Sequence, residues 1–141
     1  MAEIQIFNML IALRDRCLSA EQHIQQSLRL TPSEFKALLQ LIPGETVSCG
    51  EFTGRLGLSD SRSSRVVDRL VKRFVLQRLE SPSDRRCKQV RLTEEGIRLQ
   101  ELVRKGMNSC EQRLTASIPP HRLQAVKTVL EDLLKNSSLS G

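Results

Sequence analysis

The sequence of 141 residues contains no tryptophan and no tyrosine, and it holds only four phenylalanines. A ligand pocket lined by aromatic rings is therefore hard to build from this chain. The sequence also has only two histidines, His23 and His121, and its four cysteines include no C-x-x-C pair. That spacing argues against a zinc site, and we expect neither a metal nor a cofactor.

Residue patterns that support catalysis or membrane insertion are also missing. We find no nucleophile beside a base, no paired carboxylates and no G-x-x-x-x-G-K-[ST] loop, so we do not expect an enzyme. No apolar run approaches the roughly 18 residues that a membrane span needs. The first residues lack the charged and apolar regions of a signal peptide. These absences predict a cytoplasmic protein without membrane contact and with reduced cysteines.

Positive charge is what the chain has in excess. Its net charge is +6 and its pI is about 9.6, above the value of roughly 9 that indicates a nucleic-acid-binding domain. Between positions 55 and 91 the acids are Asp60, Asp68, Glu80 and Asp84. The more numerous basic residues of that span are Arg55, Arg62, Arg65, Arg69, Lys72, Arg73, Arg78, Arg85, Arg86, Lys88 and Arg91. This concentration favours double-stranded DNA as a partner.

The order of elements in residues 48–93 predicts a winged helix-turn-helix. Ser48-Cys49-Gly50-Glu51 has the spacing of a capping box and starts a short helix. A tight turn at Leu56-Gly57-Leu58 leads to a second helix from Ser59 to about Phe74. Two extended segments follow, separated by the polar turn 81–86. In such a module the second helix enters the DNA major groove, and the hairpin reaches the backbone or the neighbouring minor groove.

The second helix of this module has two contrasting faces when it is projected at about 100° per residue. One face carries Ser63, Val66, Val67, Leu70, Val71 and Phe74; the other carries Ser61, Arg62, Arg65, Asp68, Arg69, Lys72 and Arg73. The alternative reading is an ordinary solvated helix. Solvated faces usually mix charges of both signs, whereas this face has four arginines and one acid. We therefore interpret it as the DNA-reading face.

The predicted DNA-binding residues divide by role. Arg62 and Arg65 lie near the start of the helix and suit base edges, because Arg can donate two bonds to guanine. Lys72, Arg73 and Lys88 suit phosphates. The full set of predicted DNA-binding residues is Ser59, Ser61, Arg62, Ser64, Arg65, Arg69, Lys72, Arg73, Asp84, Arg85, Arg86 and Lys88.

Amphipathic helices are predicted on both sides of the module. The first, from about Ile4 to Leu28, has two apolar stripes. Contact with a partner chain would bury both of them at once. A short helix from Thr31 to about Ile42 follows, with Thr31 and Glu34 as a capping box. A long helix begins after Thr93 and reaches about Ile118. A last helix carries Leu123, Val126, Leu130, Leu133 and Leu134.

These patterns predict one chain with four functional parts. Residues 1–30 and 94–136 supply N- and C-terminal dimerisation helices, and residues 31–93 form the winged helix-turn-helix DNA-binding domain. Residues 137–141 are small and polar and form a flexible tail. The expected fold class is mainly α with a small β-hairpin wing.

Several motifs in order resemble those of MarR-family transcriptional regulators over nearly the whole chain. They are Leu56-Gly57-Leu58-Ser59, Val67-Asp68-Arg69-Leu70, Ser83-Asp84-Arg85-Arg86 and Val90-Arg91-Leu92-Thr93-Glu94-Glu95-Gly96. The resemblance implies a homodimer formed by the first and last helices and a near-palindromic operator, usually bound by a repressor. It also implies that Arg86 contacts the minor groove while Asp84 helps to hold the wing.

Three features depart from the family pattern. Phe74 stands where glycine commonly ends the recognition helix, which favours a different helix exit because Phe resists the left-handed conformation. Arg62 and Ser63 replace a common Thr and aliphatic residue, which favours an altered operator preference. The absence of tyrosine argues against the hydroperoxide sensors of the family, which pair a first-helix cysteine with tyrosines.

Two cysteines are candidate redox residues, and the inducer remains open between an oxidant and a small molecule. Cys87 follows Asp84-Arg85-Arg86, and nearby cations lower the pKa of a thiol. The alternative is that Cys87 is an incidental hairpin residue. Cys17 falls on an apolar stripe, where we expect a buried, inert thiol.

The alternative to a DNA-binding regulator is a winged-helix protein-interaction module without DNA binding.

Overall fold

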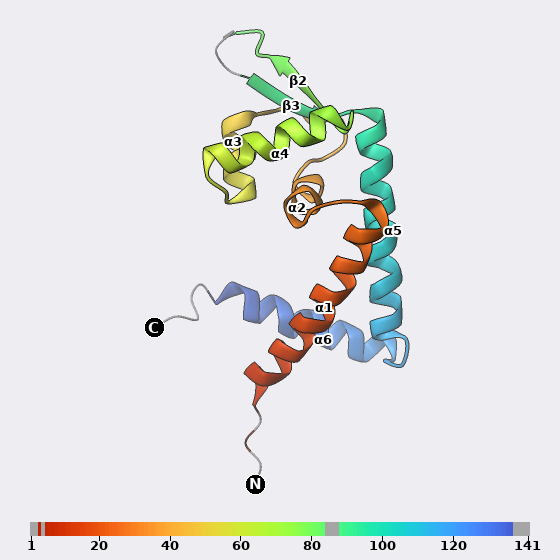
Figure 1. Cartoon of the computed structure of the whole chain (residues 1–141). Coiled ribbons are helices and arrows are strands. Elements are labelled where there is room, and N and C mark those ends of the chain that lie inside the picture. Colours follow the sequence, from red (N-terminus) through yellow and green to blue (C-terminus); the bar gives the residue numbers. More distant parts are fainter. Residues whose placement is uncertain (1–2, 4, 84–87, 137–141) are drawn as a thin grey trace. The chain divides into compact units, whose positions relative to one another are not determined.

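Hydroxyl side chains start four of the helices, as the sequence predicts. In the computed structural model, which describes residues 3, 5–83 and 88–136 (Figure 1), Thr31 accepts a bond from the Glu34 amide at 3.1 Å and Ser48 accepts one from Glu51 at 3.0 Å. Ser59 and Thr93 do the same for the amides of Arg62 and Gly96, at 3.3 and 3.0 Å. Each bond satisfies an amide that has no partner within its helix.

The chain forms six helices and three strands within the described residues. In order they are α1 (Ile6–Leu28), α2 (Pro32–Leu39), β1 (Val47–Ser48), α3 (Cys49–Leu56), α4 (Asp60–Lys72), β2 (Leu76–Glu80), β3 (Lys88–Leu92), α5 (Glu94–Thr115) and α6 (Pro120–Lys135). The predicted fold class, mainly α with a small wing, is confirmed. Contacts divide the chain into two compact units, one up to Met107 and one from Asn108.

The sheet has one strand more than the predicted hairpin. Its order is β1-β3-β2, and both pairings are antiparallel. Val90 of β3 lies opposite Val47 of β1 on one side and Arg78 of β2 on the other. The two-residue β1 is too short to show an alternating pattern in the sequence, so local patterns do not predict it.

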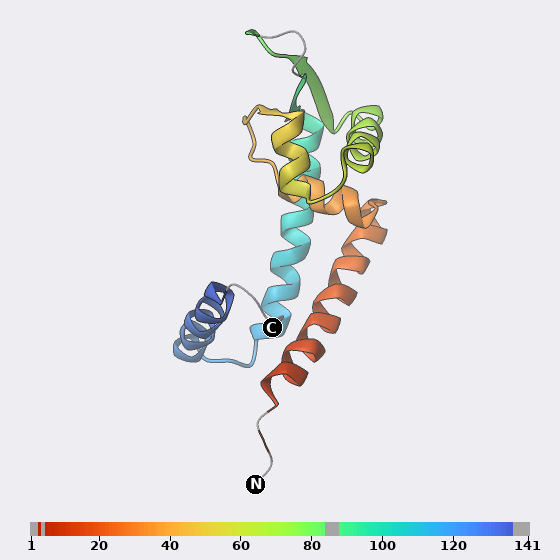
Figure 2. The same ribbon diagram turned by 90° about the vertical axis from the view of Figure 1, so that its left-hand side faces the viewer.

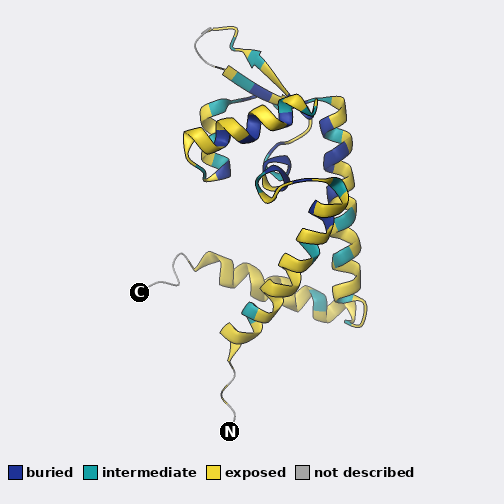
Figure 3. Ribbon diagram, viewed as in Figure 1, coloured by how far each residue is buried: buried dark blue, intermediate teal, exposed yellow. Residues whose placement is uncertain are grey.

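The core of the first unit lies under the sheet and between α2, α3 and α4, where Figure 3 shows the buried residues concentrated. Its largest fully buried apolar side chains are Phe52, Leu38, Leu41, Leu56, Leu70, Val75, Val90 and Val103. The C-terminal part of helix α1 lies beside α5 near Gly106 (Figures 1 and 2). Gly106 permits this approach, because a Cβ there would lie 3.0 Å from the Ile24 side chain.

Helices α2 and α5 each end about three residues earlier than predicted. Helix α2 stops at Leu39 rather than near Ile42, because the chain turns to bury Leu41 in the core. The buried Gln100 of α5 donates to the carbonyls of Leu38 and Leu41, at 2.5 and 2.6 Å, and so satisfies this helix end. Helix α5 stops at Thr115 rather than near Ile118.

Candidate nucleic-acid interface

Helix α4 has the two faces that its sequence predicts. Ser63, Val66, Val67 and Leu70 are buried. The opposite face is exposed and carries Ser61, Arg62, Ser64, Arg65, Asp68, Arg69 and Lys72. Ser59 caps the helix at its exposed start, and its hydroxyl lies 3.3 Å from that of Ser61. The face therefore presents a helix N-terminus, short polar side chains and cations to solvent, all of which suit a polyanion.

The wing lies beside α4 and is tied to it by an ion pair. Arg78 of β2 lies 2.5 Å from Asp68 of α4, and both side chains are partly exposed. Lys88 at the start of β3 lies 3.7 Å from Glu80 across the hairpin. The predicted wing residues Asp84, Arg85, Arg86 and Cys87 lie outside the described residues. The structure thus joins Asp68, which sequence reasoning placed on the reading face, to the strand that carries the wing.

The last cations of α4 have unequal surroundings. Lys72 is exposed, whereas the Arg73 guanidinium donates to the carbonyls of Arg29 and Leu28, at 2.8 and 3.2 Å. It also lies 3.1 Å from the Glu34 carboxylate, and Nε of Arg69 lies 3.7 Å from the same group. Glu34 does not complete the predicted capping box, because its carboxylate is buried against these two arginines.

Phe74 corrects two expectations. The helical projection places it on the apolar face, yet it is 77% exposed. A phenylalanine is also expected to resist the left-handed conformation, yet its φ is 60°. The turn is held on both sides, because the Phe74 amide donates to Val71 and the Thr93 hydroxyl donates to the Phe74 carbonyl. These bonds fix the backbone, so the chain accepts the strain and leaves the ring in solvent.

Arg55, the first residue of the basic span, is bound within the fold. Its guanidinium donates to the Glu45 carboxylate at 2.6 and 3.0 Å, to Glu51 at 3.1 Å and to the Gln40 carbonyl at 2.9 Å. The bond from Arg55, aided by the Ile42 amide, lowers the pKa of Glu45 to about 2. Hydrogen bonds to Glu45 in turn raise the pKa of Arg55. This arginine therefore orders the loop before β1.

Cys17 differs from its expected burial. It is predicted to be buried on an apolar stripe, but it is exposed in the single chain. Sequence reasoning gave no role to Cys49, which starts α3 and is partly buried. Burial raises the pKa of the Cys49 thiol, and the opposing positive charges of Arg78 and Lys88 do not cancel that effect. The thiol is therefore less reactive than a solvated one.

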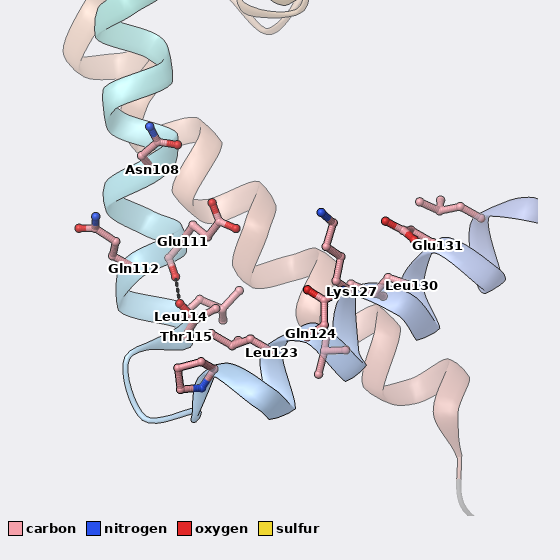
Figure 4. Close-up of a pocket in the computed structure, with 13 residues that line it drawn as sticks. Asn108, Glu111, Gln112, Leu114, Thr115, Leu123, Gln124, Lys127, Leu130 and Glu131 are labelled. Atoms are coloured by element: carbon pink, nitrogen blue, oxygen red, sulfur yellow. Dashed lines mark hydrogen bonds between the residues drawn. The ribbon is translucent and has the colours of Figure 1, made fainter.

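The second unit contains an open groove between the end of α5 and α6, with a volume of about 790 Å³. Figure 4 shows the side chains around it, including the Thr115 hydroxyl that donates to the Glu111 carbonyl. Its apolar lining is supplied by Leu114, Pro120, Leu123, Val126, Leu130 and Leu134. None of the residues of α6 is buried. The groove and this helix form an apolar surface without cover in the described single chain.

Comparison with known proteins gives the context for this geometry. The MarR family model matches residues 30–88, which run from before α2 to the start of β3. Residues 30–88 therefore form a MarR-family domain. Its arrangement of α3, α4 and the wing is the winged helix-turn-helix of a MarR-family transcriptional regulator.

Individual proteins and solved structures are similar over most of the chain. The transcriptional repressor MprA of Escherichia coli K12 is 25% identical over 134 residues, which are 94% of this chain and 76% of MprA. The crystal structure of apo wild-type MarR from E. coli superposes with a TM-score of 0.79 at 21% identity, covering 95% of this chain and 99% of MarR. PcaV from Streptomyces coelicolor, solved with its natural ligand, superposes with a TM-score of 0.66 at 20% identity, covering 98% and 100%.

None of the helices in the described ranges is long and apolar enough to cross a membrane.

Proposed function

We propose that this MarR-family regulator is a homodimeric repressor that binds a near-palindromic operator through α4 and the wing. The observation that carries the proposal is the exposed face of α4, where a capped helix start and several arginines face solvent beside the wing. Under this proposal α4 lies in the major groove, as recognition helices do. A winged-helix protein-interaction module, the alternative function, has no need of such a face.

Arg62 and Arg65 read bases in this proposal. Both are exposed in the first half of α4, the half that meets base edges in helix-turn-helix complexes. Arg69, Lys72 and Lys88 meet phosphates, and Ser59, Ser61 and Ser64 supply short donors along the same edge. Arg86 with Asp84 extends the contact to the minor groove, as the sequence resemblance implies, with Arg85 beside them.

Dimerisation is supported by apolar surface at both ends of the chain. In α1, Ile6, Phe7, Met9, Leu13 and Leu18 are between 42% and 63% exposed. In α6, Val126, Val129, Leu130, Leu133 and Leu134 are between 39% and 84% exposed. Surfaces of this kind mark protein interfaces, and a second copy would place two recognition helices about 34–36 Å apart, one turn of DNA.

Light scattering at micromolar concentration tests the dimer. We expect twice the mass of the chain, and Leu130→Glu, which puts a charge in the groove between α5 and α6, should shift the mass toward one chain. Lys135→Glu at the exposed end of the same helix is the matched control, since it changes charge outside the groove lining. A wild-type monomer of one chain mass would overturn the homodimer.

Operator binding is tested with genomic fragments selected by the protein. Arg65→Ala should cost about 1–3 kcal/mol on the selected site and relax specificity at one position. Lys72→Ala should weaken all DNA alike and lower the salt slope by about one unit. Arg86→Ala should reduce affinity without changing the dimer. Equal losses on operator and random DNA for Arg65→Ala would contradict base reading.

Repression and its release rest on the comparisons and on the sequence. MprA is named a repressor and PcaV was solved with a ligand, so we infer repression that ends when a small molecule or an oxidant acts. A reporter gene behind the selected operator should be more active without the protein. If the wing thiol is the sensor, peroxide should lower the operator affinity of the wild type but not that of Cys87→Ser. If only Cys17→Ser keeps its operator affinity in peroxide, Cys17 is the sensor instead. Unchanged wild-type affinity in peroxide favours a small-molecule inducer.

A further inference from the structure

Arg73 joins three elements that are distant in the sequence. It extends from the C-terminal cap of α4 and donates to the carbonyls of Leu28 and Arg29, where α1 ends. Its third partner, Glu34, lies in the first turn of α2. Carbonyls at a helix C-terminus have no partner within the helix, so one guanidinium satisfies the end of α1 while it holds α2.

Glu34 is buried, so its position depends on the positive charges of Arg69 and Arg73. Its side chain is 5% exposed, and a carboxylate withdrawn from water to this degree requires cationic partners. Arg73 provides a hydrogen bond at 3.1 Å, and Arg69 adds positive charge at 3.7 Å. The Arg73 side chain is itself only 35% exposed. Three of the five N–H donors of Arg73 are thus committed to partners within the protein.

We propose that Arg73 is a positioning residue, which anchors the C-terminal end of the recognition helix to the end of α1 and the start of α2 through Glu34. The inference rests on the proposed DNA-binding role of α4, and it removes Arg73 from the residues that contact phosphate. Because α1 is also a proposed dimerisation helix, the anchor links the recognition helix of each protomer to the helix through which it dimerises.

The two roles of Arg73 predict opposite results for conservative variants. Lys retains the charge that a phosphate needs, but it lacks the planar fork that bridges two carbonyls and a carboxylate. A phosphate contact therefore predicts near-normal binding by Arg73→Lys, whereas the anchor predicts a loss. Glu34→Gln removes a negative charge from the protein, which by electrostatics alone should hold or raise affinity for DNA; the anchor predicts weaker binding.

The experiment measures operator affinity against salt for Arg73→Lys, Glu34→Gln and the double variant. We expect each single variant to bind roughly three- to thirtyfold more weakly, with an unchanged salt slope, and the double variant to lose less than the product of the two losses. The matched controls are Arg98→Lys and Glu95→Gln, which alter an exposed ion pair of α5 at 2.6 Å and should stay within twofold of wild type. Wild-type affinity in Arg73→Lys, or tighter binding by Glu34→Gln, overturns the proposal.

Amide hydrogen exchange without DNA provides a second readout and separates this proposal from the DNA-binding role. The amides in the last turn of α4 should exchange at least about threefold faster in Arg73→Lys and Glu34→Gln than in the α5 controls. Unchanged exchange in that turn overturns the anchor even if the protein binds DNA. If these amides exchange faster in the variants but the protein selects no DNA, the anchor is supported and the proposed function is contradicted.

Discussion

Asp68 of the recognition helix and Arg78 of the wing strand form an ion pair of 2.5 Å. Asp68 projects from the exposed face that carries the arginines, and an unpaired carboxylate there would repel DNA. The structure gives it a partner in the same chain, Arg78, which links β2 to the recognition helix. Two elements proposed to contact one stretch of DNA therefore share a lateral contact outside the apolar core.

Asp68→Asn tests whether this contact matters for binding. Removal of an acid from a DNA-facing surface should by itself raise affinity, but we expect an affinity about threefold lower, since the wing loses its tie to α4. The change in unfolding free energy should stay below about 1 kcal/mol, because both side chains are partly exposed. Asp60→Asn in the first turn of α4 is the control and should hold or raise affinity. Tighter operator binding by Asp68→Asn would contradict the positioning role.

Gly96→Ala should destabilise the fold by about 2–4 kcal/mol. A Cβ on Gly96 would lie 2.1 Å from the Val75 carbonyl oxygen, so the start of α5 must move away from the chain that enters β2. Gly54→Ala in α3 is the matched control, because nothing lies within 4 Å of its Cβ position. It should gain up to about 1 kcal/mol from helix propensity. Urea unfolding measures both, and equal stabilities would show that the α5 contact is looser in solution.

Ser63→Ala should raise stability by about 0.5–1.5 kcal/mol. The Ser63 hydroxyl is buried on the core face of α4 and makes no hydrogen bond within the described structure. Alanine removes that polar atom and also has the better helix propensity. Chemical denaturation of the two proteins provides the comparison, with Ser64→Ala on the exposed face as control. A loss of more than about 1 kcal/mol in Ser63→Ala would mean that the hydroxyl has a partner in solution.

Phe74→Gly should gain up to about 1 kcal/mol, because a left-handed conformation costs a side-chain-bearing residue about 1–2 kcal/mol. Part of that gain is offset by the greater freedom of glycine in the unfolded chain. The ring is 77% exposed, so its loss removes little buried surface. Phe74→Ala keeps the backbone strain and should gain nothing. If the Gly and Ala variants have the same thermal midpoint, strain at φ 60° is not the cause.

Stability should fall in acid partly through Glu45. Its pKa is lowered from 4.5 to about 2 by Arg55 and the Ile42 amide, so its stabilising contribution is complete above about 4.5 and is lost as the pH falls through 2. Glu45→Gln should therefore be less stable than wild type at pH 6, and the difference should shrink between pH 4.5 and 2. Unfolding by urea at a series of pH values measures this difference. A gap that stays constant down to pH 2 would contradict the assignment.

Helix starts and faces could be predicted from sequence because they depend on neighbours three or four positions apart. The caps at Thr31, Ser48, Ser59 and Thr93 follow from such short distances, as does the separation of Val66 and Leu70 from the arginines of α4. The order of motifs also indicated the MarR family. The DNA contacts themselves, including those of Asp84–Arg86, remain predictions.

The tertiary structure alone distinguished side chains that look alike in sequence. Lys72 and Arg73 are adjacent cations, yet only Arg73 meets Glu34, which is 39 positions away. Gln100 donates a hydrogen bond to the carbonyl of Leu38, which is 62 positions away in the sequence. Strand β1 forms by pairing with β3, which is also distant in the sequence. A local pattern gives the direction of a side chain relative to its helix axis, but which groups it meets depends on how distant segments pack. For this protein, the sequence determined which side of α4 is exposed, and the packing of α1 and α2 decided that Arg73 is bonded within the protein while Lys72 is exposed.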